Sequence, residues 1–530
     1  MRISFSARLW ILVYLLAANH SFAAVLTHGP VVGGVTDTAA KVFLRTDQTA
    51  FVQVRYSTDP TFTSYSTSDR LTTDATSDFT RIIPLNNLTS ETKYYLDVTV
   101  NGVPQLTSPY PYFATFPPAG SSRNFTFLVL TDFINTKDLT ESSQTFASAG
   151  FTNPVFAFIG GDFDHRNPKI LADKRMMFKD LYDPSTPYMS GFVNLILRKM
   201  AIAHQWDDHD AGLNGIDKTY ARWDLSQQVF QEYVPSYQLP SVTPGIWQKF
   251  GYAQADFFVL DCRSQRDPET DHDGPDKSML DGNNLGASGE LQWLKDGLLG
   301  STAGWKIIFT SVITNPTTKF PDAWAGYQTE WNSLKDYINS NNIQGIIFIS
   351  GDLHLGAIDN GIASGFPEMC VSQPNGNGNC PTALPGVWSQ GYYNDQTCKG
   401  FSLVTVTTEP DQLTLIVLDE FGHTQISYTL GDGLPTPTPT PTPAPPVITM
   451  QPVDRTVPVG RRARFSVTAT GTLPLEYQWR KNGGNIPGAQ SSIYVTPPVA
   501  NGDDGSTFDV IVANSYGSVT SNTATLTVKQ

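Results

Sequence analysis

Six short apolar runs in the middle of the chain constrain its fold more than any other feature. They are FTFLVL (125–130), VFAFIGG (155–161), MAIAHQW (200–206), FFVLDCR (257–263), WKIIFTS (305–311) and GIIFIS (345–350). Runs of this length, bounded by polar residues, are typical of buried strands in α/β proteins. Such sheets carry their chemistry beyond the carboxyl ends of the strands. The pattern therefore predicts an α/β fold with a site at that edge.

Polar side chains that suit metal ions follow several of these runs. They are Asp132, Asp162, His165, Asp207, Asp208, His209, Asp210, Asp352 and His354. So many neighbouring carboxylates repel one another unless cations or hydrogen bonds compensate. Three of the eight histidines of the chain belong to the same set. The combination favours a hydrolytic site with two metal ions.

Each segment alone also fits a plainer role. Asp352-Leu353-His354 fits a turn with a capping side chain, and 206–210 fits a solvated acidic turn. The apolar strand and the tryptophan before the acidic turn make that second interpretation less attractive. His204 lies inside a predicted strand, so we expect it to be a core or supporting residue.

The overall charge limits the classes of partner. The formal net charge is −14, and nothing resembles a basic stripe, which argues against a nucleic-acid partner. A phosphate substrate stays compatible with this charge, because bound cations would dominate the local field.

The first 23 residues predict an export signal. Arg2 and Arg8 precede the apolar stretch 9–18, and Ser21-Phe22-Ala23 offers a small-x-small cleavage site. The apolar run is too short for a membrane anchor, and no later stretch could span a bilayer. Without a twin arginine, we expect Sec-type export and a secreted or periplasmic protein.

Export permits disulfides between the four cysteines. Cys380 and Cys398 bracket a loop rich in Gly, Pro and Asn and form our preferred pair. Cys370 with Cys398 is the alternative. Cys262 lies inside a predicted strand, where a small core thiol is the favoured interpretation. The spacings do not suggest a zinc site.

The chain divides into five predicted segments. They are a signal peptide (1–23), an N-terminal β-sandwich (24–118), the α/β domain (119–432), a linker rich in Thr and Pro (433–446) and a C-terminal β-sandwich (447–530). The linker composition gives an extended spacer that cannot form a core. Within the α/β domain we expect helices at 290–300 and 330–342, and strands at 401–408 and 412–422 that complete a second sheet.

Both flanking regions resemble known sandwiches. The first resembles fibronectin type III domains, with Tyr94 supplying the hydroxyl of the tyrosine corner. The last resembles immunoglobulin-like domains, with Trp479 as the core tryptophan. There Phe508 replaces the usual corner tyrosine, and Val467 with Val510 replaces the disulfide. For this module we expect a spacer role or contact with a cell surface or polymer.

Three motifs together resemble the alkaline phosphatase D (PhoD-like) family of calcineurin-like metallophosphatases. They are Trp-Asp-Asp-His-Asp (206–210), Asp-Cys-Arg-Ser-Gln-Arg (261–266) and Ser-Gly-Asp-Leu-His (350–354). The resemblance covers residues 25–432. It implies an α/β metallophosphatase core of mixed β-sheets sandwiched by helices.

The resemblance also implies roles for individual residues. One metal would be held by Asp132, Asp162, His165 and His354, and the other by Asp162, Asp208 and Asp352. His209 would contact the phosphoryl oxygen or the leaving group. Arg263 would be a phosphate contact, with an ion pair to a local acid such as Asp261 as the alternative. Asp207 and Asp210 would orient the ligands.

Two positions depart from the family pattern and bear on the metals. The best-known members place Cys at position 132 and Tyr at position 165, which suit ferric iron. Asp and His there also suit Zn²⁺, Mn²⁺ or Fe²⁺. The second metal would have oxygen ligands only, which favours Ca²⁺, Mg²⁺ or Mn²⁺. We therefore expect two metal ions drawn from Fe, Zn, Mn and Ca.

The implied reaction is hydrolysis of phosphate monoesters or diesters by metal-activated water. A phospholipase D-type phosphodiesterase is the alternative within this class. A different class is a surface-binding protein whose catalytic fold has lost its metals, and loss of hydrolysis with EDTA distinguishes an enzyme from such a binder.

Overall fold

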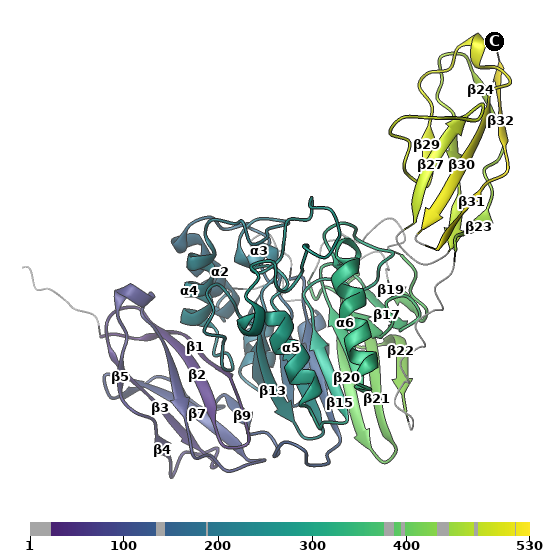
Figure 1. The fold of residues 1–530 in the computed structure, drawn as a ribbon. Helices are drawn as coiled ribbons and strands as arrows, with labels where there is room; N and C mark the ends of the chain where they lie inside the picture. Colours follow the sequence, from purple (N-terminus) through teal and green to yellow (C-terminus); the bar gives the residue numbers. More distant parts are fainter. Residues whose placement is uncertain are drawn as a thin grey trace, which may run out of the picture. The chain divides into compact units, whose positions relative to one another are not determined.

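The apolar runs of the middle region form strands of two different β-sheets (Figure 1). The computed structural model describes residues 23–133, 144–186, 189–375, 386–393, 398–431, 445–470, 475–514 and 516–529.

The first sheet has nine strands within the described ranges. In spatial order they are β22 (Thr424–Leu430), β21 (Asp411–Asp419), β20 (Gly400–Thr408), β10 (Phe125–Leu130), β11 (Phe156–Ile159), β12 (Ala201–His204), β1 (Leu26–Gly33), β2 (Ala40–Thr46) and β6 (Thr80–Leu85). The neighbours β10, β11 and β12 are parallel. The strands predicted at 401–408 and 412–422 are confirmed as β20 and β21, but they do not form a separate sheet, because β20 pairs antiparallel with β10.

The second sheet has seven strands among the described residues. Their order is β13 (Gln248–Tyr252), β14 (Ala255–Val259), β15 (Trp305–Phe309), β16 (Ile346–Ser350), β18 (Pro367–Cys370), β17 (Gly356–Asn360) and β19 (Gly391–Tyr393). The strands β14, β15 and β16 are parallel. The six predicted runs are thus all strands, divided equally between the two sheets.

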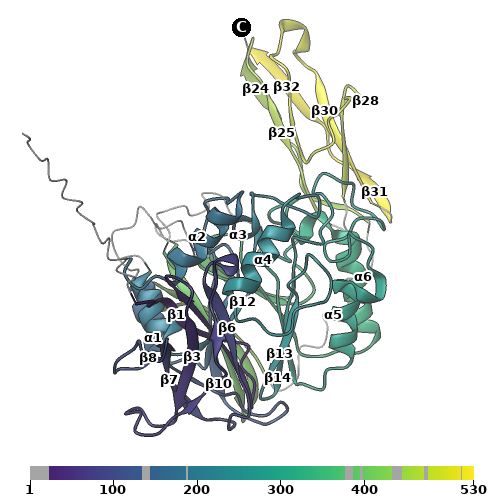
Figure 2. The same ribbon diagram turned by 90° about the vertical axis from the view of Figure 1, so that its left-hand side faces the viewer.

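The two sheets pack face to face, and helices cover their outer faces (Figure 2). The helices are α1 (Gln144–Phe151), α2 (Leu171–Tyr182), α3 (Asp208–Ala211), α4 (Trp223–Tyr233), α5 (Glu290–Leu299) and α6 (Gln328–Ser340), with a π-helical turn at Phe192–Leu197 and 3₁₀ turns at Ala75–Ser77, Gly286–Ser288, Trp324–Gly326 and Asn501–Asp503. Phe127 of the first sheet meets Phe257 of the second edge-on, with ring centroids 5.3 Å apart. The helices predicted at 290–300 and 330–342 are confirmed as α5 and α6.

Amphipathic faces decide which sheet each helix covers. Leu294 of α5 and Leu334 of α6 join the core cluster of Phe258 and Phe348 on the second sheet. Helices α2 and α4 pack instead on the first sheet, through residues such as Phe178 and Phe230. Burying these faces removes apolar surface from water, which stabilises the layered arrangement.

The N-terminal β-sandwich shares a sheet with the α/β core. Strand β1 pairs parallel with β12, so β1, β2 and β6 extend the first sheet. The facing sheet contains β3 (Phe51–Ser57), β4 (Ser66–Thr67), β5 (Leu71–Thr72), β7 (Lys93–Val100), β8 (Val103–Pro104) and β9 (Tyr112–Ala114). The predicted corner contact is present, because the backbone N–H of Thr89 donates to the Tyr94 hydroxyl over 2.9 Å. The first sheet crosses the predicted boundary at 118/119.

The C-terminal region is an immunoglobulin-like β-sandwich with its own core. Its strands are β23 (Val447–Met450), β24 (Arg455–Pro458), β25 (Arg464–Ser466), β26 (Thr468–Thr470), β27 (Glu476–Lys481), β28 (Gly484–Asn485), β29 (Ile493–Val495), β30 (Thr507–Asn514), β31 (Gly517–Thr520) and β32 (Ala524–Lys529). Trp479 is fully buried and packs in one cluster with Phe465, Phe508 and Val510. Packing takes the place of the disulfide here.

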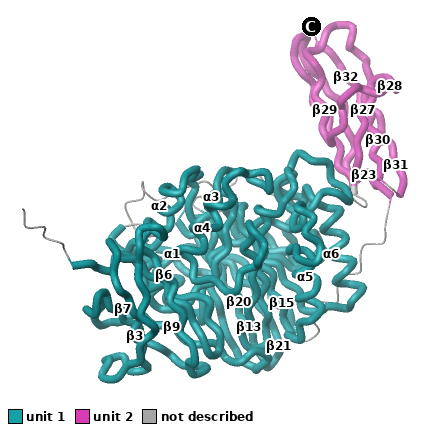
Figure 3. The backbone as a smooth tube through the Cα atoms, turned by 60° about the vertical axis from the view of Figure 1, so that its left-hand side comes forward, with its two compact units in different colours: residues 1–435 teal, residues 436–530 magenta. Residues whose placement is uncertain are grey.

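The chain forms two compact units that divide between Pro435 and Thr436 (Figure 3). This point lies inside the predicted linker, whose residues 433–444 are outside the described ranges, as are residues 1–22 of the predicted signal peptide. No helix of the described residues is long and apolar enough to cross a membrane.

The cysteines differ in their bonding state. Cys398 forms a disulfide, whereas Cys262 and Cys370 are free and buried. The alternative pairing of Cys370 with Cys398 is therefore wrong. Cys380 lies outside the described residues, so the preferred pairing stays a prediction.

Asp78 links the N-terminal strands to two helices of the core. Its carboxylate pairs with Arg45 of β2 and Lys179 of α2, each at 3.2 Å, and accepts a hydrogen bond from the Tyr233 hydroxyl of α4. Burial opposes the charge, but these partners outweigh it and lower the pKa of Asp78 to about 2.

We expect Asp78→Asn to destabilise the protein by about 2 kcal/mol at pH 7, because Arg45 and Lys179 lose their negative partner and the amide keeps only one acceptor oxygen. A lowered folded-state pKa gives stability that is present above the unfolded value near 4 and is lost as the pH falls toward about 2. Melting of both proteins between pH 7 and pH 2 measures this. The difference between them should shrink below pH 4, and a constant difference would contradict the prediction.

Candidate metal centre

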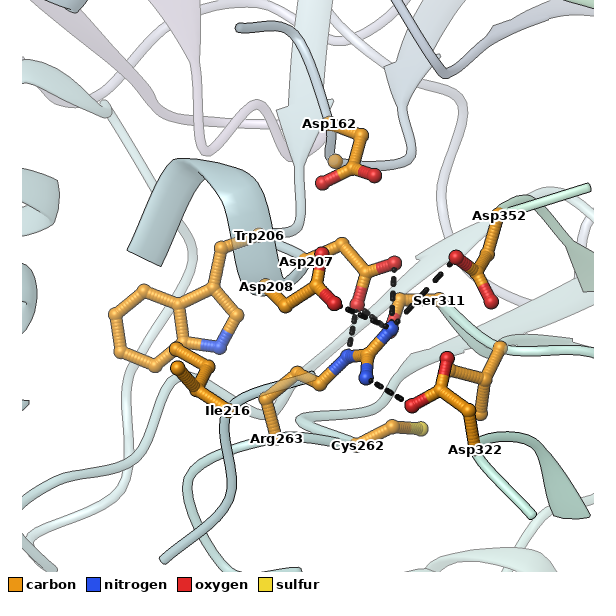
Figure 4. Close-up of polar contacts among 12 residues, drawn as sticks. Asp162, Trp206, Asp207, Asp208, Ile216, Cys262, Arg263, Ser311, Asp322 and Asp352 are labelled. Atoms are coloured by element: carbon orange, nitrogen blue, oxygen red, sulfur yellow. Dashed lines mark hydrogen bonds and ion pairs between the residues drawn. The ribbon is translucent and has the colours of Figure 1, made fainter. Parts of the chain in front are cut away.

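The predicted ligand residues come together at the carboxyl ends of four strands. Asp132 follows β10, Asp162 and His165 follow β11, residues 207–210 follow β12 and form the start of α3, and Asp352 and His354 follow β16. The first three strands belong to one sheet and β16 to the other. The site therefore lies where the carboxyl-end edges of both sheets meet, and Figure 4 shows Asp162, Asp207 and Asp352 there.

The backbone at this edge is held in a sparsely populated conformation. Asp132, Asp162, Asp352 and His354 have φ values of 56°, 50°, 67° and 59°. A residue with a Cβ atom pays for such a conformation with steric strain, which is found preferentially at functional sites. All four positions are predicted metal ligands, so the strain coincides with the set chosen from the sequence.

Two glycines allow the ligand loops to approach their neighbours. A Cβ atom on Gly161, which has φ +92°, would lie 2.6 Å from the backbone nitrogen of Asp207. A Cβ atom on Gly351 would lie 2.5 Å from Thr131 Oγ1. Only glycine fits at either position without moving backbone or buried side chains. The Gly that precedes Asp162 and the Gly that precedes Asp352 thus bring these carboxylates into the site.

Asp210 fixes two of the loops to each other. Its buried carboxylate accepts backbone N–H bonds from Asp162 at 2.7 Å, Phe163 at 2.8 Å and Asp207 at 3.0 Å. This agrees with the orienting role that the family resemblance implied for Asp210.

His165 presents one ring nitrogen to the site. Its Nδ1 lies 3.0 Å from the carbonyl oxygen of Phe133, which can only accept, so Nδ1 carries the hydrogen. The lone pair is then on Nε2, which is buried without a partner and lies 3.7 Å from Asp162 Oδ2. A carbonyl that orients a ring in this way is the usual support of a metal-binding histidine.

Four buried side-chain atoms of the predicted ligands have no hydrogen-bond partner. They are Asp162 Oδ2, His165 Nε2, Asp208 Oδ1 and Asp352 Oδ2. Leaving such atoms unpaired in a protein interior costs free energy, and a cation removes that cost. These oxygen and nitrogen donors therefore fit the metal ions that the fold implies.

Geometry places the ligand atoms in two groups that share Asp162. One group is Asp162, His165 and His209, and the other is Asp162, Asp207 and Asp352; within each group the ligand atoms lie within 4.8 Å of one another. The shared carboxylate has the position of the predicted bridge. The groups contain Asp207 and His209, which we had expected to act around the metals, and they do not contain Asp132, Asp208 or His354.

The three residues outside these groups still line the same site. Asp132 accepts the backbone N–H of Asp352 at 3.1 Å and lies 3.9 Å from His354 Nε2. The Oδ1 atom of Asp208 lies 3.9 Å from His209 Nε2. The rings of His165 and His354 have centroids 5.3 Å apart. The full predicted ligand set stays a prediction.

The pKa values of the buried acids and histidines indicate that a positive charge would stabilise the site. Burial raises the pKa of Asp132 to about 7, and burial together with the charge of Asp208 raises that of Asp162 well above its ordinary value. Burial lowers the pKa of His165 to about 4 and that of His354 to about 3. Both imidazoles are therefore neutral at pH 7, which is the form that binds metals.

Arg263 differs from its predicted role. Its side chain is completely buried, bonds to both carboxylate oxygens of Asp207, and donates to Asp322 at 2.8 Å (Figure 4). Its Nη2 also lies 3.4 Å from Asp208 Oδ2 and 3.8 Å from Asp352 Oδ1. Although burial opposes the charge, these carboxylates raise its pKa well above the usual value.

The phosphate contact predicted for Arg263 does not agree with this burial, because carboxylates already surround the guanidinium. The alternative, an ion pair with a local acid, is found, but its partners are Asp207 and Asp322 and not Asp261. Asp261 instead accepts hydrogen bonds from Trp206 Nε1 and the Ser264 backbone at 2.8 and 3.0 Å. Arg263 therefore orients acidic residues of the site.

Sequence reasoning missed several residues that contact the predicted set. Lys319 donates to the side chain and, at 2.8 Å, to the carbonyl of Asp352. Ser311 donates to Asp207 at 2.8 Å, and Asn167 contacts His209. Lys319 comes from the loop after β15, where no motif marks it. Ser311 is the last residue of the apolar run 305–311, and this position at a strand end was its only available signal.

The overall fold is that of the metallophosphatases. The chain aligns with the solved structure of PhoD at a TM-score of 0.61 and 17% identity, over 78% of this chain and 92% of the other. It aligns with a purple acid phosphatase from yellow lupin (Lupinus luteus) seeds at a TM-score of 0.55 and 13% identity, over 77% and 74% of the two chains.

A family model matches the catalytic region of the sequence. Residues 192–429 match the model of the PhoD-like phosphatases, which places this part of the chain in that family. Residues 23–118 match the model of a domain of unknown function (DUF7800). Alkaline phosphatase D of Bacillus subtilis (strain 168) is 27% identical over 176 residues. That alignment spans 28% of this chain and 30% of the relative.

Proposed function

We propose that this protein is a metal-dependent phosphoric ester hydrolase that acts on monoesters, diesters or both. The observation that carries the proposal is the group of four unpartnered donor atoms on Asp162, His165, Asp208 and Asp352, buried at the strand ends of a PhoD-like fold. Family membership supports the reaction class, and the donor atoms support the need for cations.

Each part of the site has a role in this reaction. Two bound cations would neutralise the phosphoryl oxygens and lower the pKa of a water molecule. Asp162 would contact both cations. His165 offers Nε2 because the Phe133 carbonyl holds Nδ1, and Arg263 keeps Asp207 in place. His209 would protonate or stabilise the leaving alkoxide, a role typically worth about 10²–10⁴ in rate.

Further parts of the proposal concern the setting of the enzyme. We propose Sec-type export to a secreted or periplasmic location, on the basis of residues 1–23. The Tyr94 corner supports a fibronectin III-like identity for the N-terminal sandwich. For the immunoglobulin-like unit we propose a spacer or a contact with a cell surface or polymer, supported by the Pro-rich segment that precedes it.

Metal analysis beside ester hydrolysis tests the function. We expect about two metal ions per chain from the two ligand groups. Hydrolysis of p-nitrophenyl phosphate and bis-p-nitrophenyl phosphate should be lost with EDTA and restored by adding the metal found. The ratio of the two rates then separates a monoesterase from a diesterase.

Two results of these measurements would contradict the proposed function or its mechanism. A chain that binds no metal and hydrolyses neither ester after addition of Fe, Zn, Mn or Ca would support the non-catalytic, surface-binding alternative. Hydrolysis that persists after the bound metals have been removed would overturn the two-metal mechanism.

A further inference from the structure

Asn167 lies beside the ring of His209 and bonds to it. Its Oδ1 atom is 2.8 Å from His209 Nδ1 and 3.0 Å from the backbone nitrogen of Asn214. Its Nδ2 donates to the carbonyl oxygen of His165 at 3.3 Å. The amide therefore joins the loop of residues 165–167 to residues 209–214.

These contacts fix which amide atom faces the ring. A backbone N–H can only donate, so the atom that faces Asn214 must be the oxygen. The carbonyl of His165 can only accept, which assigns the other amide atom as the nitrogen. Since Oδ1 can only accept, the His209 Nδ1 that faces it carries a hydrogen. In the neutral ring the lone pair is then on Nε2.

The Nε2 atom of His209 faces the acidic residues of the site. Nε2 is 3.9 Å from Asp208 Oδ1, and the backbone N–H of His209 donates to Asp162 at 3.2 Å. The ring also lies against His165, with centroids 4.5 Å apart. Its side chain is 17% exposed, so a substrate can reach it.

We propose that Asn167 is the positioning residue of His209: it keeps a hydrogen on Nδ1, so that Nε2 can take up the proton that the attacking water loses and give it to the leaving group of the phosphate ester. The proposal deepens the proposed function and rests on it for the role of Nε2. The tautomer itself follows from the hydrogen bonds and can be measured separately.

The backbone at this position suits Asn and guides the choice of variants. Asn167 has φ +54°, a conformation that Asn, Asp and Gly tolerate best. Asn167→Gly removes the acceptor without adding strain, and Asn167→Asp keeps an acceptor oxygen. Asn153, exposed and at φ +51°, provides the matched control Asn153→Gly away from the site.

The first readout needs no activity. Nitrogen-15 NMR of the His209 ring in the metal-free protein should show hydrogen on Nδ1 in the wild type, in Asn167→Asp and in Asn153→Gly. Asn167→Gly should show a mixture of the two tautomers. A wild-type ring with hydrogen on Nε2 would overturn the proposal, whatever the enzyme does.

The second readout separates positioning from a general loss of structure. Asn167→Gly should lower kcat/KM about 10- to 100-fold for an alkyl phosphate, whose leaving group needs a proton. It should lower kcat/KM by less than about 3-fold for p-nitrophenyl phosphate, which leaves readily. Asn167→Asp should recover most of the alkyl phosphate activity, and Asn153→Gly should match the wild type.

Several outcomes would contradict this role. An equal loss with both esters would mean that Asn167 only supports the fold. A lower metal content in Asn167→Gly would mean that Nε2 holds a metal, as the grouping with Asp162 and His165 also permits. Inactive wild-type protein would refute the proposed function while the ring measurement still tests the tautomer.

Discussion

Asp162→Asn should abolish hydrolysis while making the metal-free protein more stable. Asp162 belongs to both ligand groups, so we expect the metal content to fall and kcat/KM to drop by more than about 10³-fold. In EDTA, the melting temperature should rise above that of the wild type. The amide removes a buried charge, which burial and the neighbouring carboxylates disfavour.

Metal analysis, kinetics and melting with and without EDTA measure these opposite effects. Asp336→Asn, on the exposed face of α6, is the matched control and should change none of them. A variant that keeps both metals, or that melts below the wild type in EDTA, would show that Asp162 is a structural carboxylate.

Arg263→Met should destabilise the protein by about 3–5 kcal/mol, the cost typical of removing one partner of a buried ion pair. The guanidinium is completely buried and contacts Asp207 and Asp322, and both carboxylates would lose that partner. Methionine preserves much of the apolar stem, so the lost charge dominates the effect. Urea unfolding of the metal-free protein measures the change directly.

Arg123→Met is the matched control. Arg123 also forms a two-pronged pair, with Glu91 at 2.7 and 2.8 Å, but at the surface. Exposed pairs contribute little, so its unfolding midpoint should stay that of the wild type. Equal effects of the two substitutions would mean that burial does not decide the contribution of Arg263. Unchanged stability of Arg263→Met would contradict its role as the counter-charge of the site.

The sequence predicted the strands better than their arrangement. Runs such as 125–130 and 346–350 are recognisable because both faces of these strands are buried, which leaves an uninterrupted apolar pattern. Which strands pair is decided by contacts between distant residues. The pairing of β20 with β10 and of β1 with β12 therefore left no local mark in the sequence.

The site shows the same difference between residues that a local pattern marks and residues whose roles depend on distant contacts. Asp162 and Asp352 could be predicted because each directly follows a strand and a glycine. The roles of Arg263, Lys319 and Asn167 could not, since they depend on which loops meet. Arg263 carries a recognisable motif, but only the fold shows that its guanidinium faces Asp207 rather than solvent.

Strands from both ends of the first compact unit belong to one sheet. This arrangement affects the order in which the protein folds. Strand β1 is made early, but its partner β12 and the strands β20 to β22 are made much later. No shorter N-terminal piece of the chain can complete this sheet, and such distant pairing slows folding. We expect the first unit to acquire its native structure only after residue 430 has been synthesised, whereas the immunoglobulin-like unit can fold around its own core.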